Sequence, residues 1–227
     1  STGIVEPVTS PRSSPMVLAV LNLKGGTSKT TSAVFLAHVL HETGWNVTLV
    51  DADPQGSAVA WSQHSPEPFP FPVLPMATSR LHAQLHDHLA PAVDAVVIDT
   101  PPLSEQALIV LSALRVATLA VVPTAPTPLE YDRLASVRET VNQAGGMRYE
   151  LQRTYAPVPA AVLLTRTVAN ASSTGVWRER IREDGWWCLD TEIRRLELFA
   201  QAGSENVQNA TETAYGDAMI ELLEGRG

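Results

Sequence analysis

Short apolar runs alternate with amphipathic segments along most of this chain. The apolar runs are rich in Val, Ile and Leu and end at Gly, Pro or Asp, which is typical of buried strands. The segments between them carry apolar residues at helical spacing, and several end at a glycine. Strands are predicted at 16–23, 46–51, 93–99, 116–123, 158–166 and 186–193, with a short one reached through the proline-rich loop 65–75. Helices are predicted at 28–44, 56–63, 79–89, 105–114, 131–146, 175–185 and 211–225.

This alternation predicts a single α/β domain. Strands that are apolar at nearly every position are buried on both faces, as in a parallel sheet with helices on both sides. The predicted organisation is a flexible leader at 1–15, rich in Pro, Ser and Thr, and one doubly wound, mostly parallel sheet domain at 16–227. Ligands of such folds bind at the carboxyl ends of the strands.

Composition narrows the classes of function. The chain is 44% apolar with a net charge of −8, so it can form a sizeable core but has no general attraction to nucleic acid or anionic lipid. No apolar run reaches the roughly 20 residues needed to cross a bilayer, and residues 1–15 do not resemble a secretory signal. The single cysteine, Cys188, cannot form an internal disulfide, and it predicts a buried thiol in a reducing cytoplasm.

The stretch "LNLKGGTSKTT" holds both lysines of the 227-residue chain, Lys24 and Lys29. It lies between the first strand and the first helix, where a glycine-rich turn presents backbone N–H groups to phosphate. Lys29 followed by Thr30 supplies a positive charge and a hydroxyl ligand for Mg²⁺. Leu23 and Ser28 occupy the two glycine positions of the usual G-x-x-x-x-G-K-[ST] pattern, so the match is to the variant K-G-G-x-x-K-[ST]-T.

Carboxylates follow two further strands. Asp51 and Asp53, in "LVDADPQGS", lie on the same face of an extended segment. They could hold a magnesium-bound water, orient an attacking water, or simply be a solvated strand end. Asp99 ends the apolar run "VVIDTPP", where an isolated charge is costly unless it meets a metal or a donor. Three such sites at successive strand ends favour a nucleotide triphosphatase.

The segments "KGGTSKTT", "VDADPQGSA" and "VVIDTPP" resemble the ParA/MinD group of P-loop ATPases with a deviant Walker A motif, closest to small ParA-like DNA partition ATPases. A weaker similarity lies in "TEIRRLELFAQAGS" and "AYGDAMIELL", so the resemblance covers roughly residues 16 to 224. It implies an ATPase with ATP or ADP and Mg²⁺ as cofactors, low basal turnover, and a homodimer that closes around two ATP molecules.

The resemblance also implies roles in the phosphate loop. Lys29 would hold the β- and γ-phosphates, Thr30 would coordinate Mg²⁺, and Lys24 would reach the partner's nucleotide across the dimer. The resemblance places the nucleotide on Lys24, Gly25, Gly26, Thr27, Ser28, Lys29, Thr30 and Thr31. Most relatives have glycine where this chain has Ser28, and a side chain in a left-handed backbone conformation there would cost roughly 1–2 kcal/mol.

For the carboxylates, the resemblance implies that Asp99 holds the metal through water and that Asp53 orients the attacking water. Asp51 would lie beside the metal as a partner of Asp53. Lys24, Lys29 and Asp53 would be the catalytic residues, and Thr30, Asp51 and Asp99 the residues around the metal. Relatives usually carry a proline against the adenine where this chain has Arg194, so the base preference is less defined than phosphate binding.

The partners that the resemblance implies are DNA and a ParB-like centromere-binding protein. The resemblance also implies that this chain is cytoplasmic and associates with the nucleoid when it is bound to ATP. The candidate DNA contacts are Arg178, Arg180, Arg182, Arg194 and Arg195, which Arg166 could extend. The alternative for the arginines at 178–182 is a surface of salt bridges with Glu179, Glu183 and Asp184.

Other functions stay open. A membrane-positioning ATPase is disfavoured because the chain ends "MIELLEGRG" rather than in a basic amphipathic helix. A positioning ATPase for another cargo, a ligase or kinase acting on a small molecule without DNA, and a nucleotide-free scaffold remain alternatives.

Overall fold

The computed structural model describes residues 14–152, 157–169, 172–195 and 206–225. The strands are β1 (Met16–Val20), β2 (Val47–Asp51), β3 (Val73–Pro75), β4 (Ala95–Asp99), β5 (Leu119–Thr124), β6 (Ala160–Thr167) and β7 (Trp187–Arg194). The helices are α1 (Lys29–Glu42), α2 (Ser57–His64), α3 (Leu81–His88), α4 (Ala107–Val116), α5 (Pro128–Gln152), α6 (Ser172–Glu183), η1 (Ala210–Glu212) and α8 (Ala214–Glu224). Most of the predicted leader, and the part of the weaker similarity at 196–205, lie outside the described residues.

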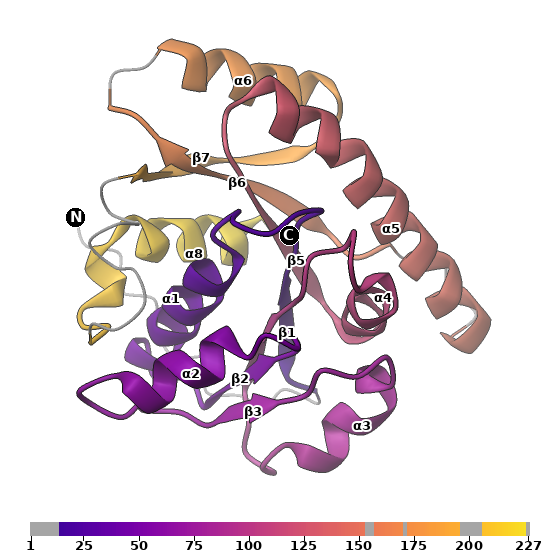
Figure 1. Cartoon of the computed structure of the whole chain (residues 1–227), viewed down its shortest axis with the longest axis vertical. Helices are drawn as coiled ribbons and strands as arrows, with labels where there is room; N and C mark the ends of the chain where they lie inside the picture. The colour runs from indigo at the N-terminus through magenta and orange to yellow at the C-terminus, as the bar shows by residue number, and fades with distance from the viewer. Residues whose placement is uncertain (1–13, 153–156, 170–171, 196–205, 226–227) are drawn as a thin grey trace.

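The strands form one sheet in the order β3-β2-β4-β1-β5-β6-β7, and every neighbouring pair is parallel (Figure 1). The predicted doubly wound α/β fold is therefore confirmed. From β1 the chain builds the sheet outward in one direction with β2, β3 and β4, and in the other with β5, β6 and β7. Such a reversal of strand order opens a crevice at the carboxyl ends of the central strands.

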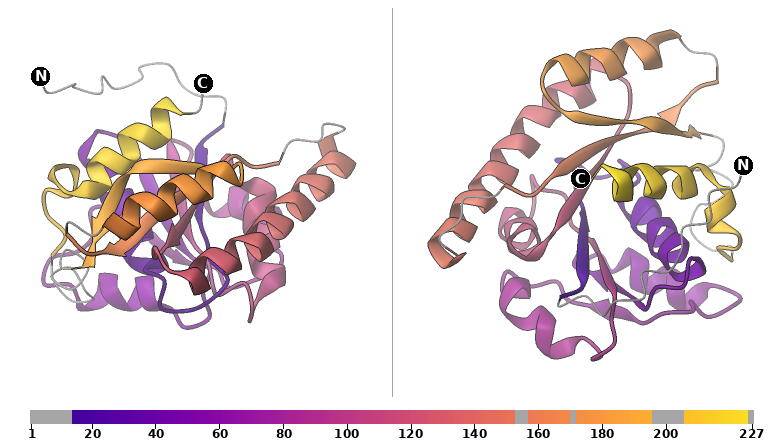
Figure 2. Two further views of the ribbon diagram at one scale, coloured as in Figure 1. Left: turned by 90° about the horizontal axis from the view of Figure 1, so that it is seen from above. Right: turned by 180° about the vertical axis from the view of Figure 1, so that it is seen from behind.

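Helices cover both faces of the sheet (Figures 1 and 2). Helices α1, α2 and α8 contribute to one apolar cluster, in which Leu36 and Leu222 are fully buried. Helices α3, α4, α5 and α6 contribute to the other, around Leu114 and Ile181. Burying one such side chain stabilises the fold by about 1.5–3 kcal/mol, so both layers hold the sheet and its strand ends rigid.

Helix α5 is longer than predicted at both ends. Its start at Pro128 is preceded by Thr127, whose hydroxyl accepts a hydrogen bond from the Glu130 N–H at 3.3 Å, as in an N-cap. The helix also continues through Gly145 and Gly146 to Gln152 instead of ending at the glycine pair. A Cβ at Gly145 would lie 3.1 Å from the Cα of Pro157, so this glycine permits a close approach of two backbones.

Strand β1 is shorter than predicted, because residues 21–23 leave the strand as a loop. The Leu21 N–H still donates to the Val121 carbonyl at 3.0 Å, while the Asn22 side chain donates to the Pro123 carbonyl at 2.6 Å. These bonds tie the beginning of the phosphate loop to β5.

Cys188 lies in β7 and is buried, as predicted. Burial raises the pKa of its thiol to about 11, so the group stays protonated at neutral pH. In the described part of the chain, no helix has both the length and the apolar character to cross a membrane.

Candidate functional site

The three sequence motifs meet at one edge of the sheet. Val20 at the end of β1 pairs in register with Asp99 at the end of β4, and Asp99 pairs with Asp51 at the end of β2. Because the strands are parallel, the phosphate loop after Val20 and both carboxylates lie at the carboxyl edge. The structure thus brings together groups that are separated by up to 79 positions along the chain.

The loop after β1 uses a left-handed backbone at two positions. Gly26 has a φ of 71° and Ser28 a φ of 66°, after which α1 begins at Lys29. The Thr27 hydroxyl donates to the Lys24 carbonyl at 3.3 Å and is almost completely buried, which closes the turn. The loop therefore leads directly into a helix N-terminus, where unpaired N–H groups and the helix dipole favour an anion.

A cavity of about 960 Å³ opens over this loop. Its size is suitable for a nucleotide. The lining residues come from the ends of β1, β2, β4, β5, β6 and β7: Gly25, Gly26, Thr27, Ser28, Lys29, Thr30, Thr31, Asp53, Gln55, Ser57, Pro102, Glu105, Ala125, Thr127, Arg166 and Arg195. All the predicted nucleotide-binding residues except Lys24 line the cavity.

Lys29 is poised in the cavity but largely shielded from water. Its ammonium donates to the Lys24 carbonyl at 3.0 Å, and only 6% of the residue is exposed. Burial lowers the pKa of Lys29, while Asp99 and Asp53 oppose this by favouring the charged amine. A buried ammonium with one carbonyl partner gains much from an anionic ligand, because phosphate would supply the charge that the site lacks.

Asp99 is the most perturbed carboxylate of the site. Burial raises its pKa to about 7; the nearby Thr30 hydroxyl favours the ionised form without reaching hydrogen-bond geometry. Neither carboxylate oxygen accepts a hydrogen bond from the described residues. A fully buried, unpartnered carboxylate beside a hydroxyl fits an oxygen-ligated Mg²⁺ site, so Thr30 and Asp99 suit the predicted metal.

We expect Asp99 to make metal-free stability depend on pH. Its folded pKa of about 7 exceeds its unfolded value of 3.8, so the stability it contributes is full below pH 4 and is lost as pH rises through 7. Between pH 5 and pH 8 the parent should therefore lose about 2–3 kcal/mol of stability that the Asp99→Asn protein keeps. Urea unfolding with a chelator measures this, and parallel pH profiles of the two proteins would contradict it.

Asp51 and Asp53 are placed differently. The Asp51 carboxylate is buried and accepts the backbone N–H groups of Asp53 at 3.2 Å and Val59 at 2.9 Å, so it holds the loop into α2. Burial is the main cause of the raised pKa of Asp51. Asp53 instead lines the cavity, half-exposed, and accepts the Gln55 N–H at 2.9 Å. The geometry suits Asp51 to positioning and Asp53 to contact with a ligand or water.

Ser28 occupies the left-handed conformation that glycine prefers. Its φ of 66° and ψ of 24° make a Cβ unfavourable at this position, and no hydrogen bond from its side chain caps α1. We expect Ser28→Gly to stabilise the protein by about 1 kcal/mol. This figure is the backbone strain that glycine relieves minus the larger conformational entropy that glycine loses on folding. Urea denaturation measures the change, with Ser28→Ala as a control that keeps the Cβ and should bring no such gain.

Lys24 lies at the outer edge of the loop. Its side chain is exposed and does not line the cavity, and only its carbonyl contacts Lys29. The position leaves the Lys24 amine accessible to a second molecule approaching the carboxyl edge.

The arginines of α6 are mostly paired within the protein. Arg178 contacts Glu192 at 3.0 Å, and Arg182 contacts Asp190 at 2.7 Å and Glu179 at 3.3 Å. Glu179 is confirmed as a predicted ion-pair partner of these arginines. The other ion pairs are formed by Asp190 and Glu192 of β7 rather than by the predicted Glu183 and Asp184. The prediction of three DNA-facing arginines is thus weakened at 178 and 182, because their charges are matched inside the chain.

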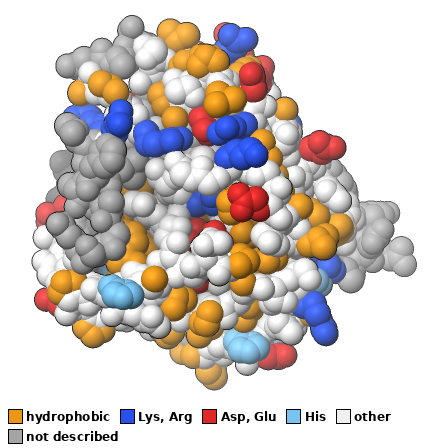
Figure 3. Space-filling view, viewed as in Figure 1, with side chains coloured by type: hydrophobic (Ala, Val, Ile, Leu, Met, Phe, Trp, Pro, Cys, Tyr) orange, Lys and Arg blue, Asp and Glu red, His pale blue; other side chains and the backbone are white. Residues whose placement is uncertain are grey.

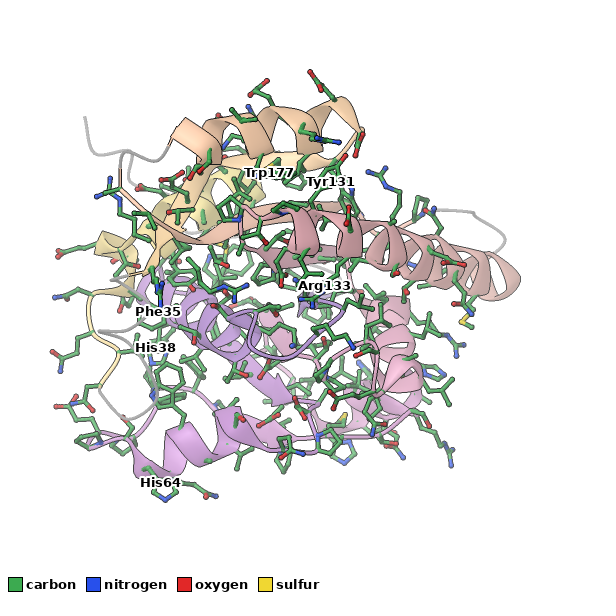
Figure 4. All side chains as sticks on the ribbon, turned by 45° about the horizontal axis from the view of Figure 1, so that its top comes forward. Phe35, His38, His64, Tyr131, Arg133 and Trp177 are labelled. Carbon is green, nitrogen blue, oxygen red and sulfur yellow. The ribbon has the colours of Figure 1, made fainter. Side chains whose placement is uncertain are left out.

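Arg180 differs from its two neighbours. Its guanidinium lies over the rings of Tyr131, 5.0 Å from the centroid, and Trp177, at 5.7 Å. Figure 4 shows these two aromatic residues side by side, Tyr131 on α5 and Trp177 on α6. Arg180 is exposed, so a cation on this surface remains accessible to an anionic partner.

Sequence reasoning missed several cavity residues. Gln55 and Glu105 follow the predicted carboxylates by a few positions, and no motif marks them. Arg166 was considered only as an extension of a DNA surface, yet it lines the cavity at the end of β6. A charged residue ending an apolar strand, as Asp99 does in β4, was the signal that could have identified Arg166.

Known proteins are similar to this chain over most of its length. The family described as CobQ/CobB/MinD/ParA nucleotide binding domain matches residues 18–209. The chain is 36% identical over 194 residues to "Maintenance of carboxysome distribution protein A" of Gloeobacter kilaueensis, covering 85% of this chain and 83% of the relative.

Two solved structures share the fold. Cobyrinic acid a,c-diamide synthase from Mycobacterium smegmatis, with bound ADP and magnesium, superposes with a TM-score of 0.68 at 22% identity, covering 93% of this chain and 96% of the other. A plasmid partition protein from Borrelia burgdorferi superposes with a TM-score of 0.66 at 17% identity, covering 94% and 100%.

Proposed function

Because the chain belongs to the CobQ/CobB/MinD/ParA nucleotide binding domain family, we propose that it is a ParA-like ATPase that positions a cargo. It binds ATP with Mg²⁺, closes as a nucleotide-sandwich dimer, and hydrolyses ATP slowly until a partner stimulates it. The observation that carries this proposal is the meeting of Lys29, Asp53 and Asp99 at one sheet edge beside the phosphate loop.

In this proposal the loop and the start of α1 bind the phosphates. Backbone N–H groups after Gly25 and the Lys29 ammonium neutralise phosphate charge. Thr30 and Asp99 would hold Mg²⁺, which would supply positive charge to the phosphates during transfer. Asp53, which lines the cavity, orients the attacking water, and Asp51 holds the Asp53 segment in place through its two backbone hydrogen bonds.

Dimerisation brings the exposed Lys24 to the partner's nucleotide. The amine lies at the carboxyl edge outside its own cavity, as an in-trans contact requires. Leu108, Leu129 and Val168 are large apolar residues exposed near the strand ends of the same edge. Exposed apolar groups around a polar cavity support a face that is covered by another molecule.

The cargo is the finer part of the proposal. The carboxysome distribution protein, matched over most of both chains, favours a positioning ATPase for a large assembly, which the sequence analysis had kept as an alternative. Partition of a plasmid or chromosome with a ParB-like partner is the second candidate, supported by the likeness to the partition protein from Borrelia burgdorferi. For either cargo, we propose that the protein acts from the nucleoid through non-specific DNA, as the resemblance to ParA-like ATPases implies.

A DNA contact would use the accessible cations. Figure 3 shows basic side chains gathered in the upper half of one face with acidic ones among them, so the surface is mixed rather than uniformly basic. Arg180 and Arg194 are exposed, whereas Arg178 and Arg182 are ion-paired. DNA binding should therefore be weak in the monomer and need two copies.

We expect ATP-dependent DNA binding that weakens at least tenfold between 50 and 200 mM salt, because each phosphate contact releases counterions. Electrophoretic mobility shift with duplex DNA, with Mg²⁺ and ATP, ADP or no nucleotide, measures this. Arg180→Ala should weaken binding, while Arg182→Ala, which removes an internally paired charge, is the matched control. Equal binding without nucleotide would contradict the proposal.

A ligase or synthase is the competing reaction class, favoured by the fold shared with the cobyrinic acid synthase. Such an enzyme consumes ATP only with its small acid substrate and is indifferent to DNA. ATP hydrolysis that rises with DNA and needs no added acid would exclude this alternative.

A further inference from the structure

Arg166 has a strained backbone at the edge of the nucleotide cavity. It has a φ of 57°, a left-handed conformation that non-glycine residues rarely adopt. The strain coincides with an irregularity between β6 and β7, where Thr165 pairs with Ile193 and Thr167 with Arg194, so Arg166 lies outside the ladder. Strain of this kind persists where the surrounding structure enforces it, and it is common at ligand-binding sites.

The strained position directs the guanidinium toward the phosphate loop. Nη1 donates to the Gly26 carbonyl at 3.0 Å, across 140 positions of sequence. Nη2 lies 3.8 Å from the Glu130 carboxylate, beyond hydrogen-bond length. The Nε and Nη2 atoms are buried and donate to no acceptor among the described residues, although a third of the side chain is exposed in the cavity wall.

Glu130 connects this arginine to helix α5. It lies in the first turn of α5, is almost buried, and accepts a hydrogen bond from Arg133 of the same helix, which Figure 4 labels. Its second carboxylate oxygen is buried and accepts no hydrogen bond from the part of the chain that the structure describes. Arg166 and Glu130 are thus a loosely joined pair with unused hydrogen-bonding capacity on both sides.

We propose that Arg166 is a phosphate ligand of the bound nucleotide and that its movement on nucleotide binding changes the first turn of α5. The guanidinium exchanges the Gly26 carbonyl and the distant Glu130 carboxylate for phosphate oxygens, which accept two parallel N–H bonds from arginine. Release of Glu130 then alters the first turn of α5. The inference rests on the proposed nucleotide binding and adds a residue that no motif of the phosphate loop contains.

The proposal makes two substitutions act in opposite directions. Removing the guanidinium removes a phosphate contact, so Arg166→Ala should weaken binding of a slowly hydrolysed ATP analogue about tenfold or more. Glu130→Gln removes the competing charge while keeping the shape, so it should strengthen binding about threefold. A purely structural ion pair predicts that both substitutions weaken binding.

Isothermal titration with Mg²⁺ and the ATP analogue, ADP or pyrophosphate measures these affinities. Arg166→Gly is the second variant: glycine fits the left-handed backbone, so it folds without the strain that alanine would retain. Arg138→Ala, an arginine that contacts Trp186 away from the cavity, is the matched control and should bind like the parent. Loss of pyrophosphate affinity in Arg166→Gly supports a phosphate contact, whereas loss for ADP with pyrophosphate unchanged means contact with the nucleoside and overturns the proposal.

Hydrogen exchange tests the link to α5. The analogue should change amide exchange at residues 129–133 in the parent and leave it unchanged in Arg166→Gly at saturating ligand. The inference would be overturned if Arg166→Gly bound the analogue as tightly as the parent does, or if the analogue changed amide exchange equally in both proteins. Either result would leave the proposed function intact. If the parent itself binds no nucleotide, the proposed function fails first.

Discussion

Lys29→Ala should lose ATP binding almost completely, with affinity reduced by roughly 1,000-fold. The ammonium is nearly buried at the start of α1 and has only the Lys24 carbonyl as its hydrogen-bond partner among the described residues. It is therefore available to the phosphates from a position that is largely shielded from water, where a charge contact is worth several kcal/mol. Titration with a slowly hydrolysed ATP analogue measures the loss, and unfolding of the ligand-free variant checks that it is folded.

The matched control is the other lysine of the same loop. Lys24→Ala removes an exposed amine outside the cavity, so nucleotide affinity of the monomer should change less than threefold. ATP-induced dimerisation and hydrolysis should instead fall together, because the in-trans charge is lost. Sedimentation with the analogue measures dimerisation. A Lys24→Ala protein that dimerises and hydrolyses ATP like the parent would remove the in-trans role, and Lys29→Ala with parental affinity would refute the phosphate site.

Asp53→Ala should bind ATP and Mg²⁺ but hydrolyse it about 100-fold more slowly, trapping the dimer. The side chain lines the cavity without holding the fold, since the only hydrogen bond that it accepts from the described residues comes from the nearby Gln55 N–H. Phosphoryl transfer depends on positioning of the attacking water, so losing that carboxylate slows the reaction and spares ground-state phosphate contacts. Single-turnover hydrolysis beside analogue affinity measures both quantities.

Asp51→Asn provides the contrast for Asp53. Asp51 is buried and its carboxylate accepts hydrogen bonds from two backbone N–H groups. This substitution should therefore lower the free energy of unfolding, without the selective loss of hydrolysis expected for Asp53→Ala. If Asp53→Ala lost nucleotide binding instead of turnover, Asp53 would be a metal-holding residue and its assignment as the water-orienting group would be wrong.

The order of strands and helices could be predicted from the sequence because it depends on local periodicity. Runs such as 93–99 are apolar at nearly every position, and the structure places β4 there with every residue buried. Element ends were less predictable, because they depend on distant partners. Helix α5 passes through Gly145 since Pro157 packs against it, and β1 ends at Val20 since the following residues bond to β5.

The phosphate loop and its carboxylates were predictable for a related reason, because each lies in a short segment that can be read locally. In a parallel sheet the carboxyl ends of the strands lie at one edge, so these segments were expected to be near one another. Lys29, Thr30, Asp53 and Asp99 could therefore be identified before the strand order was known. The family of the chain follows from the same segments, as the match over residues 18–209 confirms.

Tertiary structure decided which charges are available. Arg178 and Arg182 look like a basic patch in the sequence, but β7 brings Glu192 and Asp190 against them. Arg166 belongs to no motif and is marked only by its place at the end of an apolar strand, and the irregular pairing of β6 and β7 brings it against the phosphate loop and Glu130. Local sequence determined the fold class and the candidate phosphate-binding residues, since both arise from neighbouring residues. Pairing between side chains more than a few positions apart depends on how the strands and helices pack, and only the folded chain determines it.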